Sequence, residues 1–167
     1  GNSIQVDVFD SSNTTLFSTA TFTSGNVTRN WSSVVNAAPG TSSYVAAQNG
    51  TNDEFHVVVT DAGGLLTGTK GTILETYAFV SKAGDAALNG NSNYYKQVLL
   101  NQSKYVYAID PVEYSSTTST WGLTGGRTFA RISTKDTTGY VTAVLTGGVD
   151  AAPASGDVQT GYDLFNN

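Results

Sequence analysis

DEFHVVVTDAGGLLTGTKGTILETYAFVSK, residues 53–82, is expected to form the centre of the fold. It opens with a dense β-branched run at Phe55–Thr60, a composition that favours a buried strand. Asp61–Gly64 follows, and its glycines allow the positive φ angles of a tight reversal. A second glycine-rich turn precedes an extended segment at Thr72–Val80. This order predicts a buried strand, a glycine-rich loop and a returning strand.

Before this stretch, the spacing of apolar residues predicts a hairpin and then two short helices. Ser3–Phe9 alternates with a period of two, which is typical of a strand, and Leu16–Thr23 is its expected partner. Thr28–Ala38 instead carries apolar residues at helical spacing, and a Pro-Gly pair ends it. Ser42–Gln48 is the second expected helix, closed by an Asn-Gly pair.

After this stretch, a polar loop at Ala83–Asn91 leads into a helix. Asn93–Gln102 has apolar residues at helical spacing, with Ser92 as its candidate cap. Lys104–Ile109 alternates as a strand does, and the following Asp-Pro pair ends it because proline lacks a backbone N–H.

The rest of the chain predicts a loop, two strands and a helix. The expected elements are an exposed Ser/Thr-rich loop at Ser115–Gly126 around Trp121, strands at Arg127–Ser133 and Tyr140–Leu145 joined by a turn at Lys135–Gly139, and a last helix capped by Ser155. Six or seven strands and three or four helices make an α+β fold. We expect a mainly antiparallel β-sheet or two-layer β-sandwich flanked by short helices, with residues 1–167 forming one domain.

Composition excludes several classes of function. The net charge is −5 with no basic run, which disfavours nucleic acid and anionic membranes as partners. The chain has no cysteine, so disulfides and thiolate metal sites are excluded, and no apolar run reaches the length of a membrane span. It also has no methionine, so we expect it to be an excised piece of a longer protein.

The glycine-rich loop from Gly64 to Thr72 is the nearest approach to a nucleotide-binding motif. A P-loop needs lysine followed by serine or threonine, so that the hydroxyl can reach the magnesium ion. Here Lys70 is followed by Gly71, and no clear helix begins there to offer its N-terminus. A structural glycine turn is therefore the favoured interpretation over phosphate binding.

Two other candidates for chemistry lie beside the first strand of this stretch. His56 is the only histidine, and a packed histidine is favoured over a metal ligand because no second imidazole is present. Asp53, Glu54 and Asp61 bracket the strand and suggest a calcium site, but they do not form a calcium-binding loop. Solvated carboxylates are the favoured interpretation of this group.

Aromatic and asparagine residues offer weaker signals. Trp121 and Tyr114 beside the Ser/Thr-rich loop could stack on sugars or on a partner, but a loop pinned by one aromatic is favoured. Five N-x-[ST] triplets carry no meaning in a chain so rich in these residues; they begin at Asn13, Asn26, Asn30, Asn49 and Asn101. The sequence therefore predicts no catalytic, cofactor-binding or metal-binding residue.

An ordered set of segments carries a resemblance to a known family. The segments are Phe55–Gly64, Thr67–Glu75, Phe79–Lys82, Ser92–Lys96, Asn101–Ser103, Leu145–Asp150, Asp157–Val158 and Gly161–Phe165. In this order they resemble the sheath protein of contractile, myovirus-type bacteriophage tails. Sheath proteins of that family are several times longer, so the resemblance implies an internal domain.

The resemblance implies a structural role and no enzyme activity. Sheath subunits stack helically around a tail tube and rearrange on contraction, which drives genome delivery into the host. The implied partners are other sheath subunits, the tail tube and the baseplate, and the implied location is the virion after synthesis in the host cytoplasm. The family joins its subunits through terminal arms, so the isolated piece is expected to be a monomer without cofactors.

Two other classes of function remain open from the residues alone. An extracellular β-sandwich binding module, an adhesin or a carbohydrate-binding domain, suits a strand-rich acidic chain and would show a row of exposed aromatic residues on one sheet face. A hydrolase ranks third, because no serine stands in a G-x-S-x-G context and no carboxylate pair is evident.

Overall fold

One four-stranded antiparallel sheet forms the centre of the computed structural model, which describes residues 2–108, 120–132 and 140–148. Its strands are β1 (Ile4–Asp10), β4 (Glu54–Asp61), β5 (Thr72–Ser81) and β8 (Tyr140–Val144), in the order β5-β4-β1-β8. The long strand β4 lies between β5 and β1 and is buried along almost its whole length. The β-branched run therefore becomes a central strand, where it has neighbours on both edges and on both faces.

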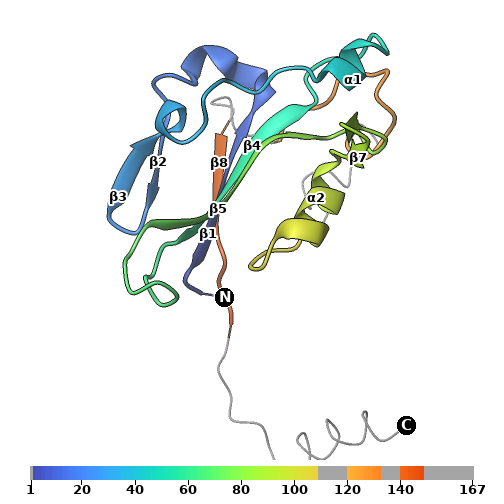
Figure 1. Cartoon of the computed structure of the whole chain (residues 1–167). Coiled ribbons are helices and arrows are strands. Elements are labelled where there is room, and N and C mark those ends of the chain that lie inside the picture. Colours follow the sequence, from blue (N-terminus) through green and yellow to red (C-terminus); the bar gives the residue numbers. More distant parts are fainter. Residues whose placement is uncertain (1, 109–119, 133–139, 149–167) are drawn as a thin grey trace, which may run out of the picture.

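Smaller elements cover the two faces of the sheet. They are the hairpin β2 (Thr21–Ser24) and β3 (Val27–Asn30), the 3₁₀ helices Ser11–Leu16 and Trp31–Ser33, helix α1 (Ser43–Ala46), the hairpin β6 (Ala87–Leu88) and β7 (Asn91–Ser92), and helix α2 (Tyr95–Gln102). The β2–β3 hairpin lies on one side of the sheet and α2 lies on the other (Figure 1).

The alternation of side chains along β4 supplies both apolar layers. Val57 points to the α2 side, where it shares a cluster with Val98 and Leu99 of the helix. Val58 points to the hairpin side, where it packs in a second cluster with Trp31. Because successive strand residues face opposite sides, one continuous apolar run builds two cores.

The structure confirms the fold class and most of the predicted elements near the sheet. The fold is mainly antiparallel β with short helices, as expected. The strands expected at Phe55–Thr60 and Thr72–Val80 are β4 and β5, and those at Ser3–Phe9 and Tyr140–Leu145 are β1 and β8. Helix α1 begins after Ser42, whose side chain accepts the N–H of Val45 at 3.2 Å, and Asn49 follows it at φ 61°.

Two predictions in the first forty residues are wrong. Leu16–Thr23 is not the partner of β1, because β1 pairs with β4 and β8, while Thr21–Ser24 pairs with Val27–Asn30. Thr28–Ala38 is not a continuous helix, since only Trp31–Ser33 forms a 3₁₀ turn. Its apolar residues Trp31, Val34, Val35 and Ala38 still reach one core.

Two predicted strands after α2 are also wrong within the described residues. In 104–108 the N–H of Lys104 donates to the Glu75 carboxylate at 2.8 Å, and the N–H of Val106 donates to Ser103 Oγ at 3.0 Å. In 127–132 the N–H of Ala130 donates to Thr120 Oγ1. Backbone groups bound to side chains cannot extend a strand ladder, so 104–108 is irregular and 127–132 keeps only an isolated parallel bridge from Thr128 to Thr51.

The connection at Ala83–Asn91 is more ordered than the expected loop. It contains the small β6–β7 hairpin, whose turn residues Asn89 and Gly90 have φ values of 51° and 82°. Two positive φ angles in a two-residue turn are the geometry that an Asn-Gly pair favours. Helix α2 starts after Tyr94 rather than after a Ser92 cap, although Ser92 Oγ accepts the N–H of Tyr94 at 3.3 Å.

Several predictions fall outside the described residues. They are the end of the Lys104–Ile109 strand with its Asp110-Pro111 stop, Tyr114, residues 115–119 of the Ser/Thr-rich loop, Ser133 and the Lys135–Gly139 turn, and the helix after Ser155.

Candidate functional site

The glycine-rich loop folds around the carboxylate of Asp61, the last residue of β4. The side chain accepts six hydrogen bonds, from Ser3 Oγ, from the backbone N–H groups of Gly64, Leu65, Leu66 and Thr67, and from Thr67 Oγ1. The bonds from the four amides measure 2.8–3.1 Å. Successive amides that point at one anion form the kind of concave site that binds phosphate in other proteins.

In this chain the anion is the protein's own carboxylate. Burial by itself would raise the pKa of Asp61, but the hydrogen bonds from Ser3, Thr67 and Leu66 outweigh burial and hold the pKa well below its ordinary value. Asp61 therefore stays ionised and keeps the loop amides occupied. A phosphate would have to displace it, which supports the structural interpretation of the Gly64–Thr72 loop.

The same loop presents two leucines at its surface. Leu65 is 81% exposed and Leu66 is 53% exposed, while their backbone N–H groups are fixed by Asp61. Apolar side chains on a loop of defined conformation lose little entropy on contact with a partner. This exposed pair is a candidate protein contact, and periodicity did not single it out.

His56 is buried on the hairpin side of β4 and has both ring nitrogens engaged. Nε2 lies 2.9 Å from the carbonyl of Ala37, and Nδ1 accepts the N–H of Phe79 at 3.0 Å. The carbonyl can only accept, so Nε2 carries the proton and the ring is neutral. Burial lowers the pKa of His56, although the carbonyl of Ala37 opposes this effect. The structure thus places His56 as a packed histidine.

The three carboxylates around β4 do not converge. Asp53 accepts the N–H of Ser42 at 2.8 Å and the hydroxyl of Ser81 at 2.5 Å, whereas Glu54 accepts the N–H of Gly40 at 3.0 Å. Asp61 lies at the other end of the strand. No group of three metal-ligating side chains is found in the described part of the chain.

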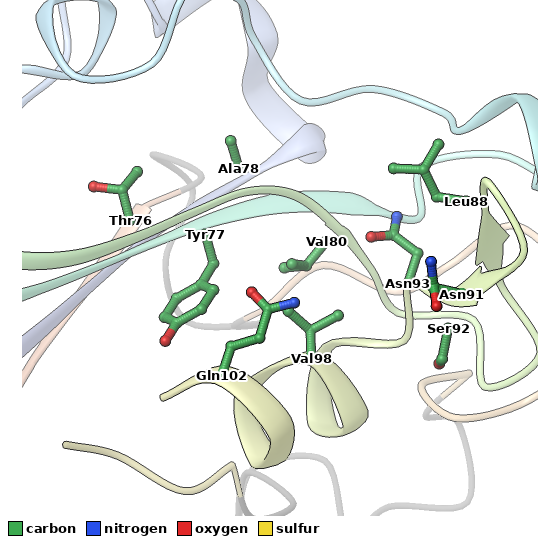
Figure 2. A pocket seen from close by; sticks show the side chains of 10 residues that line it. All are labelled: Thr76, Tyr77, Ala78, Val80, Leu88, Asn91, Ser92, Asn93, Val98 and Gln102. Carbon is green, nitrogen blue, oxygen red and sulfur yellow. The ribbon is translucent and has the colours of Figure 1, made fainter. Parts of the chain in front are cut away.

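A groove of about 250 Å³ opens between β5, the β6–β7 hairpin and α2, as Figure 2 shows. Tyr77 of β5 and Gln102 of α2 point into it, and Asn93 closes one end by donating to the carbonyl of Phe79 at 2.9 Å. Tyr77 is its only titratable lining residue, and burial raises the pKa of this phenol. The groove can offer neutral hydrogen bonds but no acid–base pair at neutral pH.

A second cavity of about 280 Å³ lies on the α2 face of β1 and β4. Its lining is almost wholly apolar and includes Trp121, whose ring centroid lies 5.1 Å from that of Phe55 and 5.3 Å from that of Tyr95. The indole N–H donates to the carbonyl of Ala130 at 2.8 Å. Over the described residues 120–126, Trp121 therefore pins its loop to the core, as the sequence indicated.

The one salt bridge found among the described residues lies deep at the end of the sheet. Lys82 follows β5 and Asp10 ends β1, and the Lys82 Nζ lies 2.5 Å from Asp10 Oδ1 with both side chains fully buried. Lys82 Nζ also donates to the carbonyl of Asn52 at 2.9 Å and lies 5.3 Å from the centre of the Trp121 ring. Burial lowers the pKa of Lys82, and the nearby carboxylate of Asp10 opposes that effect.

Sequence reasoning did not single out the Lys82–Asp10 pair. The two residues are separated by 72 positions, and although Lys82 ends one of the sheath-like segments, nothing in the sequence links it to Asp10. No local signal identifies such a pair, because only the antiparallel order β5-β4-β1 brings their strand ends together.

Comparisons of this chain with protein-family models, with curated proteins and with solved structures return no match. Among the helices that the structure describes, none combines the length and the apolar character needed to cross a membrane.

Proposed function

We propose that this chain is an internal domain of a contractile tail sheath subunit, with a structural and not an enzymatic role. The observation that carries the proposal is the way in which the sheath-like segments fit together. Phe55–Gly64, Thr67–Glu75 and Phe79–Lys82 form one continuous unit, namely β4, the loop closed around Asp61, and β5. The polar side chains of this unit, such as Asp61 and Lys82, form hydrogen bonds inside the fold.

Each distinctive residue of that unit has a structural role. Asp61 accepts hydrogen bonds from the loop amides. Gly71, at φ 76°, lies so close to the β2–β3 turn that an added Cβ would collide with the carbonyl oxygen of Ser24. Lys82 is fully buried against Asp10. A subunit that transmits force needs such a rigid unit, because contraction depends on a free-energy difference between two packings of intact domains.

The exposed side chains of Leu65 and Leu66 also support the proposal, because they offer an apolar contact at the surface. A subunit in a helical lattice must meet neighbours through apolar contacts, and side chains fixed on an ordered loop suit this purpose. The contacts within a lattice are proposed for the full-length protein, in which other sheath subunits, the tail tube and the baseplate are the partners.

The alternative of a carbohydrate-binding or adhesin module receives less support. Among the described residues, the exposed aromatic side chains are Tyr105 and Tyr107, which follow α2 and do not belong to the sheet. A flat row of aromatic rings on a strand face would favour that function.

The proposal is tested by labelling contractile-tailed virions with antibodies raised against this chain. Regular decoration along the whole tail that follows the sheath as it shortens is the expected result in negative-stain images. Antibodies against a tube or fibre protein of the same virion serve as the control for access. Label confined to fibres or baseplate would move the chain to receptor binding and contradict the proposal.

A further inference from the structure

The buried Lys82–Asp10 pair has the arrangement of two reactants. We propose that Lys82 Nζ and the side-chain carbonyl carbon of Asp10 become joined by an amide, an intramolecular isopeptide bond, formed in the folded chain with loss of one water. The pair lies at the ends of β5 and β1, on either side of β4, so the bond would tie three adjacent strands together (Figure 1). This inference does not depend on the proposed sheath function.

Proximity is the first requirement, and Lys82 Nζ is in hydrogen-bond contact with the carboxylate that it would attack. Nζ lies 2.5 Å from Asp10 Oδ1, and both side chains are fully buried. The backbone of Lys82 is held on both sides, since its N–H donates to the carbonyl of Asp53 at 2.8 Å and its carbonyl accepts the N–H of Gly122 at 2.8 Å. Holding two groups in contact in this way replaces a bimolecular step by an intramolecular one.

Stabilisation of the developing charge is the second requirement. Asp10 Oδ2 accepts the backbone N–H of Ile132 at 2.5 Å, so this amide is placed to hold negative charge on Oδ2. Oδ1 faces Lys82 and also accepts the hydroxyl of Ser11 at 3.2 Å. The two oxygens therefore have different surroundings, with Oδ2 as the carbonyl oxygen that remains and Oδ1 as the oxygen that leaves.

The reaction balances without an added oxidant or cofactor. One Nζ proton passes to Oδ1, which gives a neutral amine and a neutral carboxylic acid. The nitrogen lone pair then attacks the side-chain carbon, and the charge moves onto Oδ2. A second Nζ proton passes to Oδ1, the bond from carbon to Oδ1 breaks, and water leaves. One proton stays on the amide nitrogen.

The surroundings also favour the product. The face of the Trp121 ring lies 5.3 Å from Nζ, and the other nearby charge, the Asp53 carboxylate, already accepts the N–H of Ser42 and the hydroxyl of Ser81. The bond would close the chain between residues 10 and 82, in a sequence that has no cysteine for a disulfide. A covalent closure of this kind restricts the unfolded chain and so stabilises the folded one.

The intact mass of the purified chain tests the proposal. We expect the folded protein to be lighter than its sequence by one water molecule. After tryptic digestion under denaturing conditions, cleavage after Lys82 should be lost, and Gly1–Arg29 should be found joined to Gly71–Lys96. A dehydrated aspartate elsewhere would change the mass equally but would leave these two peptides separate, and that result would overturn the proposal.

Lys82→Arg is the matched control, because arginine keeps the positive charge but does not form this amide. Its mass should equal that of its sequence, and this readout does not require the variant to be as stable as the wild type. A wild-type mass without loss of water, together with normal cleavage after Lys82, would show an ordinary buried ion pair. Loss of water in Lys82→Arg as well would also refute the assignment.

Discussion

At the scale of single residues, buried polar side chains hold distant parts of the backbone together. His56 bonds the carbonyl of Ala37 on one side and the N–H of Phe79 on the other. Phe79 has a φ of 56°, at a point where the register between β4 and β5 shifts. A bulky residue in this region is strained, so the bond from its N–H to His56 helps to keep the bulge in place.

The pH dependence of stability should depend on His56, the only histidine. Its pKa is lowered in the folded state, so below its ordinary value of 6.5 the unfolded chain binds more protons than the folded chain. Stability is then complete above pH 6.5 and falls on acidification, by up to about 1.4 kcal/mol per pH unit. Urea unfolding at pH 7.5 and at pH 5.5 measures this loss.

His56→Gln is the control for that experiment, because glutamine can hydrogen-bond but does not titrate. We expect this variant to be less stable at pH 7.5 but to lose less stability between the two pH values than the wild type. Equal losses in both proteins would mean that the neutral, buried ring is not the source of the pH dependence.

At the scale of elements, the β4–β5 loop packs closely against the β2–β3 hairpin. A glycine in each turn, Gly71 and Gly25, makes this close contact possible. A Cβ placed on Gly71 would lie 2.5 Å from the carbonyl oxygen of Ser24, and one placed on Gly25 would lie 2.7 Å from the carbonyl oxygen of Ala62. Both glycines have positive φ, at 76° and 59°. Two turns can approach this closely only where neither has a side chain.

A pair of alanine substitutions separates backbone strain from this close approach. Gly68→Ala places a Cβ in open space at φ 81°, so it should lower the free energy of unfolding by about 1 kcal/mol through strain alone. Gly71→Ala adds the collision with the hairpin and should cost about 3 kcal/mol. Chemical denaturation of both variants gives the comparison, and similar losses would argue against a tight contact between the two elements.

At the scale of the whole molecule, both edges of the sheet formed by the described residues are poorly suited to strand addition. The pairing of β5 with β4 is interrupted by two irregularities, and Ser81 at its end already bridges to Tyr94. At the other edge, β8 has only five residues. Short or irregular edges limit edge-to-edge association, and a net charge of −5 makes separate copies repel one another.

The isolated chain should therefore be monomeric. Size-exclusion chromatography with light scattering should give a mass near 17.4 kDa, with no increase at higher protein concentration. The variant Leu65→Ser should behave identically, since a pair of exposed leucines is too small to hold a dimer by itself. A stable dimer or larger species would contradict this prediction and point to an assembly contact within the domain itself.

The sequence by itself determined the elements that depend on local pattern. The β-branched run of β4, the alternation of β1 and the helical spacing of α2 could be identified from neighbouring residues alone. A structural role for the glycine loop was also favoured, because Gly71 follows Lys70 where a P-loop needs serine or threonine. The β6–β7 hairpin was missed although its Asn89-Gly90 turn was a local signal.

Only the tertiary structure decided the features that depend on distant partners. The segments after Ser103 and after Gly126 alternate like strands, yet side chains such as Glu75 and Thr120 take some of their amides, and only an isolated bridge to Thr51 forms. The bond between Asp61 and Ser3 and the pairing of Lys82 with Asp10 likewise join residues far apart in the chain. Local pattern records propensity and periodicity, whereas a buried charge finds its partner only when the order of the strands brings the two together.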